Sequence, residues 1–393
     1  MSLRAVIFGA GNVGRGFLGQ LFCESGYHVT FVDIDQPLIA TLKERKHYTI
    51  RLVDNERTQE VQVGPVDGLL AQEEEAVAQA LARATLGATA VGARALPHIA
   101  PLVAKGISQR MEQRVEHPLN IIVCENLKGA ASIFRQMVAE HLPEEGKAYL
   151  ATHVGFVETV IGRMVPELPP ELRAQDPSLI IVEPYKELPV DQTGFVGEPP
   201  NIVGMELCEN FALYTARKLY LHNAGHAVLG YLGYQRGHTL GYKALEDPFI
   251  RPILEGAMEE SIRGIVARYG ANEGWLREHV NDLLRRFANR ALADPVLRLA
   301  RDPLRKLAPN DRLVGAARTA EVAGILPLNL AWGIAGALAF DAPQDRVAQE
   351  LQQLIAEQGV ESVLRQICKI DPKEPLGEAT LERYQRLKER RWR

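Results

Sequence analysis

The stretch Arg4-Ala5-Val6-Ile7-Phe8-Gly9-Ala10-Gly11-Asn12-Val13-Gly14 decides the fold of the first part of this chain. Its first five residues form a short apolar run, which predicts a buried strand. A G-x-G-x-x-G turn follows, and residues 15–25 predict a helix. Strand, glycine turn and helix in this order are the context that a dinucleotide-binding fingerprint requires.

Each glycine has its own purpose in such a turn. Gly9 allows the tight bend, Gly11 lets the backbone approach a pyrophosphate, and Gly14 lets the helix pack close to the strand. The N-terminus of the helix then offers N–H groups and the positive end of its dipole to the phosphates. The residues expected to contact the dinucleotide are Gly9, Gly11, Asn12, Val13 and Gly14.

A carboxylate follows the second predicted strand. This strand, Val29 to Val32, ends at Asp33, which lies 19 residues after Gly14. A carboxylate at this place can accept hydrogen bonds from both ribose hydroxyls and repels a 2′-phosphate. The expected cofactor is therefore NAD rather than NADP, and Asp35 is the weaker candidate for the ribose.

Further strands alternate with helices. Residues 48–63 predict a hairpin, residues 71–84 a helix, and residues 88–91 and 120–123 two buried strands. This alternation predicts an α/β fold, a Rossmann-type doubly wound parallel sheet. Asn126 follows the last of these strands, where residues line the ligand crevice. It is a site candidate, although a loop-capping asparagine fits the position equally well.

The chain then moves toward a second domain. We expect a helix at 129–141, a strand near 148–152, a helix opening at Gly155 to Glu158, and a strand at 179–182. The Pro-rich stretch 166–200 is interpreted as the crossing between domains. A length of 393 residues suits two domains: an NAD-binding domain over 1–195, and a mostly α-helical substrate and catalytic domain over 196–393.

Composition excludes several classes of protein. The net charge is -4, whereas nucleic-acid binders are usually basic. The four cysteines are far apart and indicate neither a disulfide framework nor a zinc knuckle. No signal peptide or membrane span is evident. We expect a cytoplasmic protein, either a monomer or a weak homo-oligomer, that acts on a small molecule without nucleic acid or membrane.

The second predicted domain contains an unusual polar helix face, in Lys218-Leu219-Tyr220-Leu221-His222-Asn223-Ala224-Gly225-His226. On an α-helix turning about 100° per residue, with Lys218 at zero, His222 falls at about 40°, His226 at about 80° and Asn223 at about 140°. One face therefore presents an amine, an amide and two imidazoles. Taken alone, such a face is typical of a solvated helix.

A nicotinamide-binding domain implies hydride transfer, which also needs a base and a group that stabilises the alkoxide. His222 and His226 stand four apart and can chelate a metal, but no third zinc ligand is identifiable. The metal-free alternative is Lys218 as general base with a lowered pKa. Asn223 and Asn126 can then donate to the substrate oxygen, while His226 holds substrate hydroxyls or orients the lysine.

These motifs resemble a known family, the polyol-specific long-chain dehydrogenases/reductases, or mannitol dehydrogenase family. Lys218, Asn223 and His226 have the spacing of its signature, and Gly9 to Phe17 (GAGNVGRGF) is similar to its N-terminus. The resemblance extends through 201–207, 256–261, 303–307 and 311–313, nearly the whole chain. It implies catalysis by the lysine without metal, and interconversion of D-mannitol 1-phosphate and D-fructose 6-phosphate with NAD.

The chain departs from the family pattern at three positions. Gly162 stands where an acidic residue is usual, and Glu158 is proposed to compensate from one helical turn earlier. Leu188 replaces an aromatic residue after Glu187, and His222 stands where a small or polar residue is more familiar. These departures affect substrate preference rather than the class of reaction.

Three functions remain open. The first is a sugar-phosphate dehydrogenase, whose basic cluster Arg305, Lys306 and Arg312 binds the substrate phosphate. The second is an oxidoreductase of the same family for unphosphorylated polyols or hexuronates, which does not need that cluster. The third is a non-catalytic NAD sensor, which has no use for Lys218, Asn223 and His226 together.

Overall fold

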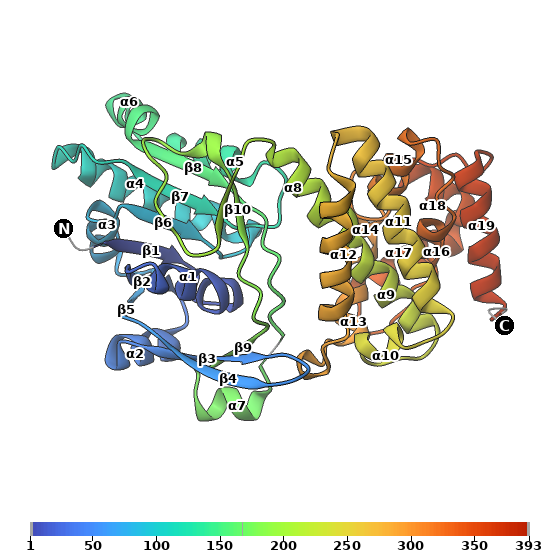
Figure 1. The fold of residues 1–393 in the computed structure, drawn as a ribbon. Helices are drawn as coiled ribbons and strands as arrows, with labels where there is room; N and C mark the ends of the chain where they lie inside the picture. The colour runs from blue at the N-terminus through green and yellow to red at the C-terminus, as the bar shows by residue number, and fades with distance from the viewer. Residues whose placement is uncertain (1–2, 167, 391–393) are drawn as a thin grey trace. The chain divides into compact units, whose positions relative to one another are not determined.

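The structure is a computed structural model that describes residues 3–166 and 168–390. The chain divides into two compact units, Met1–Phe211 and Ala212–Arg393 (Figure 1). The sequence places the boundary after residue 195. In the structure, β11 (Met205–Cys208) pairs with β10 (Leu188–Asp191), so residues 205–208 stay with the first unit.

The first unit is built on a six-stranded sheet in which every pair of neighbours is parallel. Its order, β5-β2-β1-β6-β7-β8, places β1 centrally and winds the chain outward in both directions. The Rossmann-type fold class predicted from the sequence is confirmed. The strands are β1 (Arg4–Phe8), β2 (His28–Asp33), β5 (Val66–Leu70), β6 (Leu86–Thr89), β7 (Leu119–Val123) and β8 (Val154–Glu158).

Alternate residues of β1 enter two different hydrophobic cores. Ala5 and Ile7 belong to one cluster of buried residues, and Val6 and Phe8 to another. Since successive side chains of a strand point to opposite faces, the sheet is covered on both. The helices of this unit are α1 (Gln20–Glu24), α2 (Gln36–Arg45), α3 (Glu74–Ala82), α4 (Leu96–Glu112), α5 (Ala130–Glu140), α6 (Glu144–His153) and α7 (Pro170–Gln175).

The predicted hairpin is confirmed and forms part of a second, smaller sheet. β3 (Tyr48–Val53) and β4 (Thr58–Val63) pair in antiparallel fashion, and β3 also pairs in parallel with β9 (Ile180–Val182). The strand expected at 179–182 is thus present. It connects the stretch predicted as a crossing back to the nucleotide-binding unit.

The sequence prediction is wrong for two adjacent elements. Residues 148–152 belong to helix α6 rather than to a strand, and residues 154–158 form strand β8 rather than the start of a helix. On α6, the rings of Tyr149 and His153 stack with centroids 4.2 Å apart, a contact that helical spacing permits. In β8, a Cβ on Gly155 would lie 2.1 Å from Asn120 Oδ1, so this glycine admits a neighbouring side chain.

All the named elements of the second unit are helical, which confirms the predicted helical C-terminal domain. Its central helix is α9, which packs on α10, α11, α13 and α16. Gly230 on α9 permits the contact with α13, because a Cβ there would lie 2.9 Å from Ala300 N. Among the described residues, no helix has both the length and the apolar character needed to cross a bilayer.

The helices of the second unit lie along the chain as follows: α8 (Phe211–Arg217), η4 (Lys218–Asn223), α9 (Ala224–Gln235), α10 (Gly241–Leu245), α11 (Ile250–Tyr269), α12 (Glu273–Phe287), α13 (Val296–Ala300), α14 (Pro303–Lys306), α15 (Val314–Val322), α16 (Leu328–Leu338), α17 (Arg346–Gln358), α18 (Val360–Gln366) and α19 (Pro375–Lys388).

Candidate active site

The three glycines of the N-terminal turn have different structural reasons. Gly9 has φ +97°, and a Cβ there would lie 2.5 Å from Ala90 O. A Cβ on Gly14 would lie 1.9 Å from Gly9 O. Both glycines are therefore required by the fold itself. A Cβ on Gly11 would meet nothing within 4 Å, so the open space beside it fits the approach of a ligand pyrophosphate.

Asp33 stands at the end of β2, beside this turn. Its Oδ2 accepts a hydrogen bond from Ala10 N at 2.6 Å, and its Oδ1 accepts from Ile34 N at 2.7 Å and Asp35 N at 3.1 Å. These backbone donors hold the carboxylate in place next to the glycines. Asp35 has a structural task, since its side chain caps α2 by accepting from Leu38 N.

The helix after the turn begins as a π-helix, η1 (Gly14–Gly19), and continues as α1. Its wide turn presents backbone carbonyls to donors from elsewhere in the unit. Tyr48 Oη donates to Arg15 O at 2.7 Å, and Arg163 donates to Gly16 O at 2.9 Å. The sequence predicts the helix but not this geometry.

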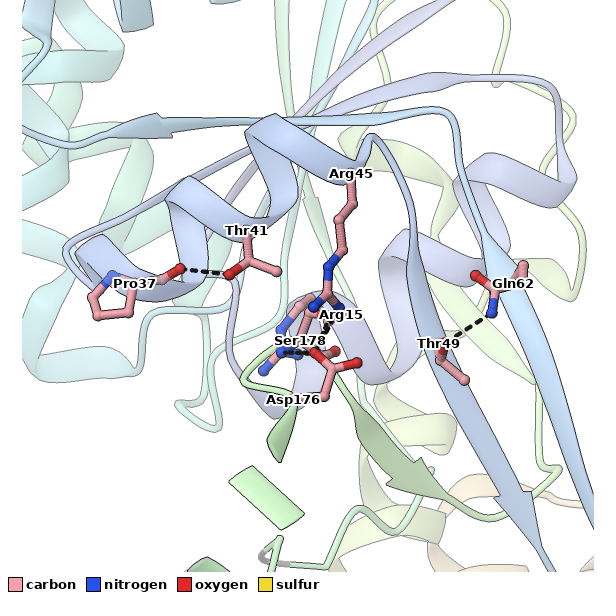
Figure 2. A network of polar contacts seen from close by, with 8 residues as sticks. All are labelled: Arg15, Pro37, Thr41, Arg45, Thr49, Gln62, Asp176 and Ser178. Atoms are coloured by element: carbon pink, nitrogen blue, oxygen red, sulfur yellow. Dashed lines mark hydrogen bonds and ion pairs between the residues drawn. The ribbon is translucent and has the colours of Figure 1, made fainter. Parts of the chain in front are cut away.

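Two arginines, one just after the nucleotide turn and one on α2, bind the loop before β9. Buried Arg15 donates to the carbonyls of Ala10 and Ser178. Arg45 on α2 donates to Asp176 Oδ1 at 3.0 Å and to Ser178 Oγ at 3.4 Å. Figure 2 shows both side chains converging on this loop. Arg15 thus stabilises the turn by linking the carbonyl of Ala10 to that of Ser178. Its position in the sequence does not reveal these contacts.

Asn126 lies just beyond the carboxyl end of β7, as predicted, and is exposed. It makes no hydrogen bond among the described residues. Its neighbour Glu125 is buried and accepts hydrogen bonds from Thr89 Oγ1 and from Val91 N. Burial raises the pKa of the Glu125 carboxyl. Glu125 ties β7 to the end of β6, while Asn126 faces solvent.

Glu158 is engaged in the fold. Its carboxylate accepts hydrogen bonds from Ala130 N at 3.1 Å and Ala131 N at 2.9 Å, at the start of α5. Burial raises its pKa, and these two N–H groups oppose that shift. The argument that Glu158 lies one helical turn before Gly162 is wrong, because Glu158 ends strand β8. A Cβ on Gly162 would lie 2.9 Å from the Tyr185 ring, which accounts for the glycine.

The segment that carries the polar motif is not a regular α-helix. Residues 211–217 and 224–235 are α-helical, but Lys218–Asn223 forms the π-helix η4 between them. A π-helix bonds residue i to residue i+5 and is frequent at functional sites. The 140° separation expected between Lys218 and Asn223 is therefore wrong, since these residues are five apart and stand one turn above each other.

Lys218 is a half-buried amine that has no counter-charge in the described part of the chain. Among the described residues its Nζ makes no hydrogen bond or ion pair. Burial lowers its pKa to about 8, and the charges of Arg312 and Arg305 act in the same direction. One turn away, Nδ2 of buried Asn223 has no hydrogen-bond partner in the part of the chain that the structure describes. A buried amide N–H without a partner is costly and fits a site that a ligand oxygen completes.

The two histidines of the motif lie together. Burial lowers the pKa of both His222 and His226 well below the usual range. For His226, the nearby charges of Arg298, Arg286, Lys306 and Arg312 add to the shift. Arg286 and Arg298 come from α12 and α13, and the sequence offers no signal that they reach this residue.

The predicted basic cluster does not act as one group. Arg312 is buried, and its Nε donates to Asp311 Oδ1 at 2.7 Å. Arg305 is exposed and donates to Asp302 Oδ2 at 2.7 Å. Lys306 is 3% exposed and donates to the carbonyl of Leu299, and its Nζ lies 5.4 Å from the Tyr231 ring centroid. The Lys306 amine is thus buried and hydrogen-bonded within the unit, which argues against its predicted contact with a substrate phosphate.

Metal binding has no evident ligand set. Within residues 3–166 and 168–390, no group of three or more His, Cys, Asp or Glu side chains is arranged to hold a metal ion. His222 and His226 contact each other through their rings, with centroids 4.8 Å apart and planes at 79°.

Comparison with known proteins decides the family. One family model, the mannitol dehydrogenase Rossmann domain, matches residues 3–204, and a second, the mannitol dehydrogenase C-terminal domain, matches residues 210–388. The chain belongs to the mannitol dehydrogenase family. The recognition of this family from the Lys218 motif is confirmed, and the chain is an oxidoreductase of the mannitol dehydrogenase family.

Relatives of similar length carry a more specific name. A mannitol-1-phosphate 5-dehydrogenase from Brevibacillus brevis is 40% identical over 385 residues, 98% of each chain. One of the same name from Bacillus velezensis is 40% identical over 380 residues, 96% of this chain and 99% of the relative.

Solved structures show the same fold at low identity. The mannitol 2-dehydrogenase of Pseudomonas fluorescens, in a ternary complex with NAD and D-mannitol, matches with a TM-score of 0.78 at 18% identity, over 100% of this chain and 93% of that one. A D-sorbitol dehydrogenase in substrate-free form matches with a TM-score of 0.82 at 16% identity, over 100% and 94%. These likenesses support the fold of a mannitol dehydrogenase family member.

Proposed function

We propose that this chain is an NAD-dependent polyol-phosphate dehydrogenase that interconverts D-mannitol 1-phosphate and D-fructose 6-phosphate without a metal. The name shared by near full-length relatives at 40% identity supports the substrate pair. The observation that carries the mechanism is Lys218, whose half-buried amine has a pKa of about 8. An amine with that pKa can exchange a proton near neutral pH.

Lys218 is the general base in the oxidation of the polyol phosphate. Its neutral amine takes the proton of the reacting hydroxyl, while the hydrogen on the same carbon leaves with its electron pair. In the reverse direction, protonated Lys218 returns the proton to the oxygen that was the carbonyl. The positive charges of Arg312 and Arg305 favour the neutral amine, which is the form that oxidation requires.

Asn223 stabilises the substrate oxygen as negative charge develops on it. Its Nδ2 is buried and has no partner among the described residues, so a substrate oxygen satisfies a donor that is already in place. Such preorganised donors stabilise oxyanions strongly. Asn126 is proposed as a further donor, because its exposed amide is not used by the fold. His226 is proposed to hold the substrate hydroxyls.

NAD is the cofactor in this proposal, and when bound it accepts or supplies the hydride. The first unit provides residues that fit it. Gly9 and Gly14 shape the turn, and open space beside Gly11 leaves room for the pyrophosphate. Asn12 and Val13 open the helix whose N-terminus faces the phosphates. Asp33, held by backbone N–H groups, is proposed to accept from the ribose hydroxyls.

Arg312 and Arg305 are the proposed partners of the substrate phosphate. The Nε of each is bound to a neighbouring aspartate. Their terminal NH₂ groups make no hydrogen bond among the described residues and can bind a phosphate bidentately. Their charges also lower the pKa of Lys218, so both arginines act on the proposed general base. Lys306 is not among the proposed phosphate ligands, since its amine is bound inside the unit. Glu158 is not a proposed substrate ligand, since its carboxylate caps α5.

A substrate panel with NADH tests the proposal. Fructose 6-phosphate is compared with fructose and fructuronate, before and after exhaustive chelation. We expect fructose 6-phosphate to have the highest kcat/KM and chelation to leave the rates unchanged. Equal or better turnover of an unphosphorylated compound would favour the second function, and activity lost to the chelator but restored by zinc would contradict the metal-free mechanism. NADH binding without turnover of any compound would favour the sensor.

A further inference from the structure

Three aromatic rings meet around the motif histidine. The ring of His226 stacks on Phe287 with centroids 4.1 Å apart and planes at 26°. The ring of His222 meets His226 at 4.8 Å and Phe287 at 5.9 Å, in both cases edge to face. The ring of His226 is therefore in contact with two other aromatic rings, one stacked on it and one at a steep angle to it.

No polar partner orients His226 within the described chain. A functional histidine is usually fixed by a hydrogen bond from one ring nitrogen to a carboxylate or carbonyl. Here His226 makes no hydrogen bond or ion pair among the described residues. Its ring contacts are with His222 and Phe287, and these restrict its side-chain rotation.

The backbone leaves room for this packing. Gly225 precedes His226, and a Cβ on it would lie 3.1 Å from Phe287 Cε2 and 2.6 Å from Met258 Cε. The absence of a side chain lets α12, which ends at Phe287, bring its ring close to the helix that carries His226. His222 is itself buried at 6% exposure, so its ring has little freedom to leave the cluster.

Basic side chains surround both imidazoles. His222 faces His226 and Lys218 along its own helix, and Arg286 and His279 on α12. His226 faces Arg286 on α12, Arg298 on α13, Lys306 on α14 and Arg312 before α15. Protonation of either histidine would add a positive charge beside these basic groups, which is unfavourable. The cluster therefore contains neutral rings, and His222 contributes packing rather than charge.

We infer that His222 and Phe287 are positioning residues, whose rings fix the orientation of the neutral His226 ring toward the substrate. The inference rests on the proposed function, in which His226 holds substrate hydroxyls. It assigns a role to His222, which departs from the family pattern, and to Phe287, which lies 61 positions beyond His226 in the chain.

Four variants test the inference. His222→Phe keeps a ring and should retain at least about half of the kcat with fructose 6-phosphate. His222→Ala and Phe287→Leu remove a ring, and we expect each to lower kcat about 10-fold, because small misplacements of reacting groups are costly. NADH affinity should be unchanged in all of them. Phe340→Leu is the matched control, since Phe340 is buried and packs on Tyr231 and Tyr234.

The pH profile separates positioning from stability. Without one ring, water reaches His226 and its pKa rises toward the usual value of about 6.5. His222→Ala and Phe287→Leu should therefore gain an acidic ionisation in kcat/KM that the wild type and Phe340→Leu lack. Comparing rates at equal folded fraction keeps the test valid for a destabilised variant.

Two results would overturn the inference. One is a wild-type kcat and pH profile in both His222→Ala and Phe287→Leu. The other is a loss in His222→Phe as large as in His222→Ala, which would make the imidazole itself the active group. If Lys218→Ala kept wild-type turnover, the proposed function would fail instead, so the two failures are distinguishable.

Discussion

Two π-helical segments of this chain, η1 (Gly14–Gly19) and η4 (Lys218–Asn223), differ in composition and in the contacts that stabilise them. η1 contains three glycines in six residues, and Tyr48 and Arg163 donate to its carbonyls. η4 contains no glycine, and its last four residues are buried. All six residues of η1 are buried as well. The difference is therefore that η1 combines burial with glycines and with hydrogen bonds from Tyr48 and Arg163 to its backbone, whereas η4 packs larger side chains.

The difference follows from what each segment is proposed to present. A pyrophosphate is bound by backbone N–H groups, which requires bare backbone at the turn. A hydroxyl that must lose a proton needs an amine and an amide donor, which only side chains supply. The i→i+5 geometry of η4 brings Lys218 and Asn223 to the same side of the helix, which a regular α-helix would not do at this spacing.

The largest effect is expected in η4. Lys218→Ala should lower kcat about 1,000-fold, because a general base contributes on the order of 10²–10⁴, while the NADH dissociation constant should stay nearly unchanged. Lys243→Ala, an exposed lysine paired with Glu246, is the control and should behave as wild type. Turnover near the wild-type value in Lys218→Ala would remove the lysine from the chemistry.

In η1 and the turn before it, the expected effects divide between stability and binding. Gly14→Ala places a methyl group 1.9 Å from Gly9 O and should lower the free energy of unfolding by about 3 kcal/mol, as overpacking does. Gly11→Ala meets no atom within 4 Å, so it should fold normally and weaken NADH binding about 10-fold. Thermal melts with and without NADH measure both quantities. Unchanged NADH affinity in Gly11→Ala would argue against a pyrophosphate at this place.

A smaller effect is expected at Asp33. Asp33→Ala should reduce the preference for NAD over NADP about 10-fold, because the repulsion of a 2′-phosphate is lost. The ratio of kcat/KM for the two cofactors is the measurement, since it cancels any general destabilisation. Asp35→Ala loses the cap of α2, which should cost about 1 kcal/mol without altering the ratio. An equal change in both variants would show that Asp33 does not contact the ribose.

The sequence predicts those parts of the molecule that depend on local pattern. The strand, turn and carboxylate from Arg4 to Asp33 follow a fixed spacing, and the hairpin at 48–63 alternates as strands do. For residues 148–158 the sequence predicts a strand followed by a helix, the reverse of what the structure has, because short apolar runs fit either a strand or a buried helix. The parallel pairing of β8 with β7 determines that residues 154–158 form a strand, and a local sequence pattern does not contain this information.

The candidate site is less predictable from the sequence, because it also depends on contacts between segments that are distant in the chain. Lys218, Asn223 and His226 are recognisable from their spacing. Their geometry depends on a π-helical turn, so a wheel drawn for a regular α-helix gives the wrong angles between them. The sequence predicts that Lys306 binds phosphate, yet its amine lies buried beside Tyr231. Phe287, Arg286 and Arg298 reach the motif only through the packing of α12 and α13.

The most direct test of the account is the pH dependence of kcat for oxidation of mannitol 1-phosphate, measured with a chelator present. Lys218 must be neutral to accept the proton, so the rate should rise with pH through a single ionisation near 8 and then level off. The reduction of fructose 6-phosphate needs the protonated amine and should fall above the same pH. A rate of oxidation that stays flat from about pH 6 to about pH 9 would contradict the assignment of Lys218 as the general base.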